Sequence, residues 1–161
     1  MTAPDAAPDA TLATRLYLED LAVGQSFRGG SCVVETDAIK RFAQEFDPQP
    51  FHLDETEAQD SLFGGLAASG WHTAAMTMRM LVDGELKLAR GVIGAGGEIS
   101  WPRPTRPGDA LRVESEILEI TPSRSKPDRG MVKVRTRTLN QHDEVVQDFT
   151  ATLIAWRRPA A

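Results

Sequence analysis

Apolar residues recur at helical spacing in the first half of the chain and at alternating spacing in the second half. From Thr36 to about Asp47 they return every three or four positions, which predicts a helix with one buried stripe. Thr36 is the expected N-cap, and Pro48 ends the helix because proline disfavours helical geometry in the residue before it. The preceding stretch, Gly24 to Glu35, alternates loosely and predicts a strand or a bent pair of strands, with Gly29-Gly30 as a bulge or turn.

Two further helices follow in the pattern. Asp54 to Asp60 suggests a short one, which Gly64-Gly65 separates from the next. The segment from Ser69 to Leu81 or Val82 is the most apolar helix of the chain, and we expect it to be buried on most sides. The residues assigned to its main apolar face are Trp71, Ala74, Ala75, Met78, Leu81 and Val82.

The remainder of the chain has the pattern of strands. Val92 to Trp101 is glycine-rich, which is typical of a strand that passes close to another backbone or to a ligand. A proline-rich turn precedes an alternating strand from Leu111 to Ile117, and Met131 to Leu139 pairs with Val145 to Trp156 as a hairpin. The sequence therefore predicts an α+β domain in which an antiparallel sheet wraps around one long central helix.

Length and composition fit one domain with a single core, since the chain has 161 residues. We expect residues 1–14, rich in Ala, Pro, Asp and Thr, to form a disordered N-terminal tail, so that the domain covers residues 15–161. The tail lacks the pattern of a secretory signal, and no segment is apolar enough to span a bilayer, so no membrane partner is expected. The net charge of −5 argues against nucleic acid as a partner.

The single cysteine, Cys32, cannot form an internal disulfide, which is compatible with a reducing compartment, and we expect a cytoplasmic protein. We expect Cys32 to be a buried apolar residue of a strand rather than a reactive thiol. His52 and Asp54 have the spacing of two metal ligands, but no third ligand stands at a suitable distance along the chain. Neither a metal ion nor another cofactor is therefore expected.

The stretch from Asp47 to Asp54, DPQPFHLD, combines an acid and an imidazole five residues apart with two prolines between them. A carboxylate that is ionised at neutral pH and a histidine that titrates near it can together orient and activate one water molecule. One group takes a proton as the other gives one, the division of labour for adding water to a double bond. The alternative, in which Asp47 closes a turn and His52 is a partly buried side chain with satisfied hydrogen bonds, stays open at this point.

A glycine-rich segment runs into the apolar helix at Ser69-Gly70. A helix N-terminus presents free amide groups and the positive end of the dipole, and Gly70 lets a ligand approach its backbone closely. A carbonyl oxygen placed there gains stabilisation as it becomes enolate-like. The competing interpretation is an ordinary serine N-cap.

Four more residues are candidates for contacts with a substrate. Trp71 and the methionines of the apolar helix would set the volume of a pocket. His72 lies in the first turn of that helix, where we expect a neutral ring that either hydrogen-bonds or packs in the core. Arg103 and Arg106 lie in the proline-rich turn, where arginines either hold the phosphates of a ligand or form solvated surface.

Taken together, these segments resemble the MaoC-like dehydratases, a family that includes R-specific enoyl-CoA hydratases. The similarity lies in three places: Asp47 to Asp54 with Ala58, Phe63-Gly64-Gly65 through Ser69-Gly70, and Trp101 to Pro104 with Pro107-Gly108-Asp109. It covers nearly all of the chain beyond the N-terminal tail. The chain departs from the commonest family pattern at Phe46, Gln49 and Ser69, where glycine, asparagine and histidine are usual.

The resemblance implies a hot-dog fold that pairs as a homodimer or a larger homo-oligomer. It implies that Asp47 and His52 form the catalytic pair and that the Gly70 amide helps to bind a thioester oxygen. The expected reaction is the reversible hydration of a 2-enoyl-CoA to a 3-hydroxyacyl-CoA, with an acyl-CoA as the substrate. One alternative is an acyl-CoA thioesterase on the same fold, which the absence of Asp and Glu from Trp71 to Val82 disfavours. The other is a non-catalytic acyl-CoA-binding protein.

Overall fold

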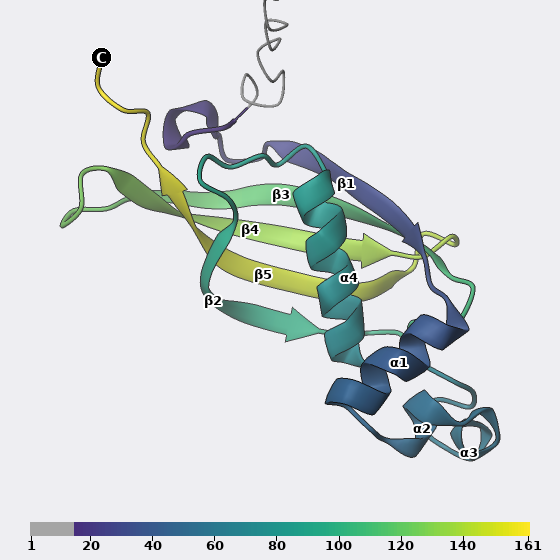
Figure 1. The fold of residues 1–161 in the computed structure, drawn as a ribbon. Helices are drawn as coiled ribbons and strands as arrows, with labels where there is room; N and C mark the ends of the chain where they lie inside the picture. Colours follow the sequence, from purple (N-terminus) through teal and green to yellow (C-terminus); the bar gives the residue numbers. More distant parts are fainter. Residues whose placement is uncertain (1–14) are drawn as a thin grey trace, which may run out of the picture.

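A computed structural model describes residues 15–161, and the tail expected at residues 1–14 lies outside them. Five strands form one antiparallel sheet in the order β1-β3-β4-β5-β2, and the helix α4 lies across one face of it (Figure 1). In chain order the elements are η2 (Leu18–Asp20, a 3-10 helix), β1 (Ser26–Val33), α1 (Thr36–Phe46), α2 (Pro50–Leu53), α3 (Glu55–Gln59), α4 (Gly70–Asp83), β2 (Ile93–Ser100), β3 (Ala110–Pro122), β4 (Arg129–Leu139) and β5 (Val145–Trp156). The predicted α+β hot-dog arrangement is confirmed.

No helix within residues 15–161 is both long enough and apolar enough to cross a bilayer.

The core lies between α4 and the middle of the sheet. Val113 and Ile117 of β3 and Val132 and Val134 of β4 are buried on the face that α4 covers. The residues between them point the other way, where charged side chains pair across strands, as in the ion pair of Arg135 with Asp148. The alternation read from the sequence is therefore the alternation of a half-buried sheet.

Three short helices gather at the end of the sheet where α4 begins (Figure 1). The helix α1 begins at Thr36, but Glu35 occupies its N-cap without a side-chain hydrogen bond, so the N-cap predicted at Thr36 was wrong by one residue. The short helix predicted from Asp54 to Asp60 is found as α3, and Asp54 is its N-cap, since its side chain accepts hydrogen bonds from the backbone of α3. The pattern did not predict α2, a single turn that starts at Pro50, because a one-turn helix has no apolar period to detect.

The side of α4 that faces the sheet differs from the prediction. Its buried residues include Thr73 and Thr77, whose hydroxyls form hydrogen bonds with Thr105 (3.0 Å) and Thr138 (2.6 Å). A buried hydroxyl with a hydrogen-bond partner is tolerated in a core. Threonines therefore occupy buried positions of α4 that the apolar pattern did not assign to its buried face. Much of the predicted apolar face lies at the surface instead: Trp71, Met78 and Val82 are 61%, 45% and 50% exposed.

Cys32 is half-buried in β1, and burial raises the pKa of its thiol. A raised pKa keeps the thiol protonated at neutral pH, where it is a poor nucleophile. The cytoplasmic location expected from the sequence stays a prediction.

The end of α4 packs tightly against the bulge of β1. Pairing between β1 and β3 is irregular from Arg28 to Ser31, as the Gly29-Gly30 pair predicted. A Cβ atom placed on Gly84 would lie 2.5 Å from the Cα of Gly29 and 2.6 Å from the carbonyl oxygen of Arg28. Because both neighbours are backbone atoms that cannot move aside, only glycine fits at position 84, directly after α4.

We therefore expect Gly84→Ala to lower the free energy of unfolding by about 1–3 kcal/mol, the usual cost of overpacking. Urea denaturation followed by circular dichroism measures the change. Gly94→Ala is the matched control, since a Cβ atom there meets nothing within 4 Å. Equal stability of the two variants would contradict the close packing of α4 on β1.

Candidate functional site

Asp47 and His52 lie at the two ends of a tight turn. Asp47 ends α1 through a hydrogen bond from its amide to the carbonyl of Ala43, and His52 lies in the single turn of α2 that Pro50 begins. This geometry brings Oδ2 of Asp47 to 3.4 Å from Nε2 of His52. The imidazole is nearly buried, with 5% of its side chain exposed, whereas the carboxylate is 19% exposed. The acid and the imidazole of the sequence motif therefore face each other.

The far side of the His52 ring is fixed by the backbone. Its Nδ1 lies 2.6 Å from the carbonyl oxygen of Ala67. A carbonyl only accepts hydrogen bonds, so Nδ1 carries a proton and the neutral ring presents the lone pair of Nε2 toward Asp47. Two acceptors thus converge, and a molecule with two O–H groups, such as water, can donate to both.

Polar neighbours keep Asp47 ionised. The side-chain amide of Gln49 donates to its Oδ1 at 2.5 Å, and Ser69 is a second polar neighbour that lowers the pKa of Asp47. Burial acts to raise the pKa of Asp47, but the polar groups of Gln49 and Ser69 outweigh burial, so the pKa lies below its ordinary value. The carboxylate is therefore an acceptor at neutral pH.

Ser69 connects the pair to the start of α4. Its side chain caps the helix by accepting a hydrogen bond from the amide of Trp71 at 3.2 Å, and the residue is fully buried. Ser69 is therefore both the N-cap of α4 and a polar neighbour of the acid, so the capping interpretation and a role at the site are compatible.

Gly70 is required for a different reason from the one expected. A Cβ atom there would lie 2.7–2.9 Å from three atoms of the Trp101 ring, so the indole, and not a ligand, occupies the space beside the α-carbon of Gly70. The amide of Gly70 is the first of α4 and has no acceptor among the hydrogen bonds of the described residues. An amide donor at the positive end of the helix dipole is thus available at the site.

A groove of about 680 Å³ opens beside the imidazole and the start of α4. The proline-rich turn forms its opposite wall, and the exposed side chain of Arg103 stands there, 3.9 Å from the carboxylate of Glu144. The groove is lined by Gln49, Phe51, His52, Leu62, Phe63, Ala68, Gly70, Trp101, Pro102, Arg103, Pro104, Thr105 and Arg106.

Arg106 lies in the groove wall but is engaged by the backbone. Its guanidinium group donates to the carbonyls of Phe63, Gly65 (2.8 Å) and Leu66 (3.3 Å). This side chain therefore holds the glycine-rich loop in place, a role that sequence spacing did not suggest. Its predicted contact with a substrate phosphate stays a prediction, and Arg103 is the freer of the two arginines.

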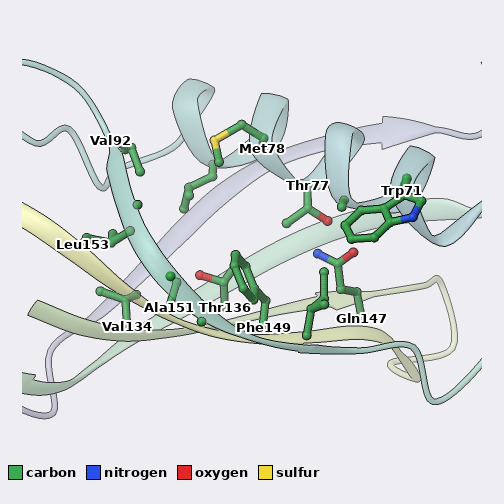
Figure 2. A pocket seen from close by; sticks show the side chains of 16 residues that line it. Trp71, Thr77, Met78, Val92, Val134, Thr136, Gln147, Phe149, Ala151 and Leu153 are labelled. Carbon is green, nitrogen blue, oxygen red and sulfur yellow. The ribbon is translucent and has the colours of Figure 1, made fainter. Parts of the chain in front are cut away.

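A second hollow, an apolar cavity of about 480 Å³, lies between α4 and the strands β2 and β5 (Figure 2). Trp71 closes one end of the cavity, as Figure 2 shows. The rings of Trp71 and Trp101 meet edge to face with centroids 5.4 Å apart. Because Trp101 borders the groove and Trp71 borders the cavity, the two indoles stand between the groove and the cavity, where the two hollows are neighbours.

His72 does not line the groove. Its ring is buried and stacks on Phe42 with centroids 4.7 Å apart. Burial, together with the charge of Arg41, lowers the pKa of His72, so the ring is neutral near pH 7. The position of His72 matches the core-packing alternative, and its predicted contact with a substrate finds no support in this arrangement.

Two polar contacts of the site have no local pattern in the sequence. Gln49 lies between two prolines, and the only feature of the sequence that pointed to its contact with the acid was its position two residues after Asp47. Trp101 donates from Nε1 to Oε1 of Gln147 at 2.9 Å, which joins residues 46 positions apart. Within residues 15–161 no group of three or more His, Cys, Asp or Glu side chains is placed to hold a metal ion.

Comparison with known proteins gives a consistent result. The model of the MaoC like domain matches residues 11–140. A crystal structure of the MaoC-like dehydratase from Rhodospirillum rubrum superimposes with a TM-score of 0.88 at 63% identity, over 90% of this chain and 99% of that one. YdeM of Bacillus subtilis is 34% identical over 80% of this chain and 90% of its own length, and a 3-hydroxybutyryl-CoA dehydratase of Methylorubrum extorquens is 29% identical over 84% and 82%.

The environment of Asp47 predicts the effect of removing Gln49. Gln49→Leu takes away a hydrogen bond to the ionised carboxylate, so we expect the pKa of Asp47 to rise, measured by NMR titration of its side-chain carboxyl carbon. A depressed folded-state pKa stabilises the protein above the unfolded pKa, and that stability is lost as the pH falls through the folded value. The variant is therefore destabilised at neutral pH and approaches the wild type in acid.

Gln44→Leu, on the exposed side of α1, is the control and leaves the pKa of Asp47 unchanged. A pKa of Asp47 that does not move in Gln49→Leu would show that the amide does not stabilise the ionised acid.

Proposed function

Because the chain belongs to the MaoC-like dehydratase family, we propose that it catalyses the reversible hydration of a 2-enoyl-CoA to a 3-hydroxyacyl-CoA. The observation that carries this proposal is the convergence of the Asp47 carboxylate and Nε2 of His52, 3.4 Å apart beside the groove. Both atoms accept hydrogen bonds when Asp47 is ionised and His52 is neutral, an arrangement suited to one water molecule. The names of the relatives indicate hydro-lyase chemistry at the coarser level of the family.

In the proposed reaction, Asp47 and His52 hold the water against the double bond. The water oxygen bonds to the β-carbon while one member of the pair takes a proton from it. A proton passes from the pair to the α-carbon, so that H and OH add across the double bond and the pair returns to its starting state. The same steps in reverse release water.

The start of α4 supports the second half of the chemistry. As water adds, negative charge develops on the thioester oxygen, and the free amide of Gly70 at the positive end of the helix dipole is a suitable donor for it. A donor that is already fixed by the helix does not have to reorganise during the reaction. Trp101, packed against Gly70, helps to fix this end of the helix.

The two hollows suggest how an acyl-CoA lies. The groove carries Arg103 at its open side, which suits the phosphates of the CoA moiety. The apolar cavity behind the indoles suits the acyl chain, because apolar surface gains free energy when it leaves water. The thioester would then stand between them, beside His52 and Gly70.

We also propose that the protein is a homodimer formed through β2 and α4. The outer edge of β2 pairs with no other strand within residues 15–161, and the strand is exposed along nearly its whole length. Trp71 and Met78 form an exposed apolar stripe on α4. They border the same cavity as the glycines of β2, so the stripe lies next to the unpaired edge of β2. A second copy paired along β2 gives hydrogen-bond partners to the backbone groups of this edge and removes the apolar stripe on α4 from water.

Substituting the pair tests the proposed reaction. We expect Asp47→Asn and His52→Ala each to lower kcat/KM for crotonyl-CoA and 2-octenoyl-CoA by about 10²–10⁴-fold, because each removes one proton-transfer group. Loss of enoyl absorbance measures the rate, chiral analysis of the product tests for the 3R alcohol, and a thiol reagent detects thioester cleavage. Asp60→Asn, exposed at the end of α3, is the control with wild-type activity.

Normal turnover by both site variants would overturn the assignment. Release of free CoA as fast as hydration would make the protein a thioesterase, and tight acyl-CoA binding without turnover would make it a binding protein.

Light scattering on the eluted protein tests the dimer. We expect twice the mass of the chain for the wild type and one chain mass for Ile93→Lys, because a charge on the edge strand opposes pairing. Val23→Lys, at an exposed apolar position before β1 and so near the opposite edge of the sheet, stays dimeric. A wild-type protein that is monomeric at all concentrations would exclude this interface.

A further inference from the structure

Gln147 is a polar residue in the wall of the apolar cavity. It lies on β5, is 1% exposed, and its amide stands at the Trp71 end of the cavity (Figure 2). Most other lining residues are apolar. Among the described residues, no charged side chain lines the cavity. A buried carboxamide in such a place requires partners for both its oxygen and its nitrogen.

The hydrogen bond with Trp101 fixes which end of the amide faces the cavity. An indole N–H can only donate, so the atom of Gln147 that lies 2.9 Å from Nε1 of Trp101 is the oxygen. The NH₂ group then points the other way, into the cavity. Within residues 15–161 it has no acceptor, since the only hydrogen bond found for the Gln147 side chain is the one from Trp101.

The other polar groups of the cavity are already paired with protein. The hydroxyl of Thr77 bonds to Thr138 at 2.6 Å, and the hydroxyl of Thr136 bonds to Ser115 at 3.0 Å. Trp71 also carries an N–H donor, but its ring is 61% exposed, whereas Gln147 is 1% exposed. Within residues 15–161 the carboxamide of Gln147 is thus the nearly buried lining group whose NH₂ lacks an acceptor, and nothing in the lining carries a charge to balance an anion.

We propose that Gln147 is a specificity-determining residue, which donates from its NH₂ group to a neutral oxygen on the acyl chain of the substrate. The preferred acyl group is therefore apolar with a ketone or similar acceptor partway along it, rather than a plain hydrocarbon or a chain that ends in a carboxylate. A plain chain would leave the buried donor without a partner, and a carboxylate would be desolvated without a counter-charge. This inference rests on the proposed hydration of enoyl-CoA.

The test compares kcat/KM for 2-octenoyl-CoA with its 5-oxo, 6-oxo and 7-oxo analogues and with a chain of the same length that ends in a carboxylate. We expect the wild type to prefer at least one oxo chain over the plain chain by about tenfold, the effect of one buried hydrogen bond. The carboxylate chain is the poorest substrate. Gln147→Leu removes the donor and abolishes the preference.

Two further variants separate recognition from packing. Gln147→Glu keeps an acceptor for Trp101 but replaces the donor, so it also loses the preference for oxo chains while tryptophan fluorescence stays as in the wild type. Met78→Leu changes the same cavity without touching its polar groups, and the ratio of oxo to plain substrate stays that of the wild type.

A wild type that prefers the plain chain, or a Gln147→Leu variant with an unchanged ratio, would overturn the inference and leave the hydratase assignment intact. If no enoyl-CoA is hydrated, the proposed function fails instead. The affinities of saturated octanoyl-CoA and its oxo analogues, measured by calorimetry, then still show whether Gln147 donates a hydrogen bond to an oxygen of the acyl chain.

Discussion

The hydrogen bond from Nδ1 of His52 to the carbonyl of Ala67 is the constraint on which the site depends. It joins the turn between α1 and α2 to the glycine-rich loop that leads into α4, and it decides which ring nitrogen faces Asp47. If the ring were free to flip, the lone pair would leave the carboxylate and the two acceptors would no longer converge. The loop that supplies this carbonyl is itself held by the guanidinium group of Arg106, so a residue remote from the pair sets its geometry.

The sequence was sufficient to predict the parts of the fold that have a period and the parts of the site that have a motif. The alternation of β3, the hairpin of β4 and β5, and the short helix α3 needed only local patterns. The orientation of α4 did not follow from the sequence, because the hydroxyl pairs that make Thr73 and Thr77 good core residues join them to distant segments. The same limit applies to Gly70, whose lack of a side chain serves Trp101. Contacts between segments that are distant in the sequence produce no regular residue pattern. The incorrect predictions concerned contacts of this kind.

The geometry also bears on the rival chemistry. A thioesterase of the kind weighed from the sequence needs a carboxylate on the central helix near the thioester. The only acidic residue of α4 is Asp83, which ends the helix and pairs with Arg79 at 2.7 Å, at the opposite end from Gly70. Asp47 lies beside the start of α4 instead, on a different element, with the imidazole as its neighbour. The carboxylate therefore lies where it can share a water with His52, as the proposed hydration requires, and not on the central helix.

The proposed recognition of the acyl chain and the proposed association of two copies would use the same residues. Trp71 is 61% exposed, yet it also closes the cavity and contacts Trp101, which packs on Gly70. A second copy that covers the stripe on α4 would remove water from the outer side of this ring and make the wall between groove and cavity more rigid. In a drier cavity, the unpaired donor of Gln147 has less water available to it and depends more on the substrate for a partner. Selectivity for the acyl chain is thus expected to be a property of the assembled protein more than of the isolated chain.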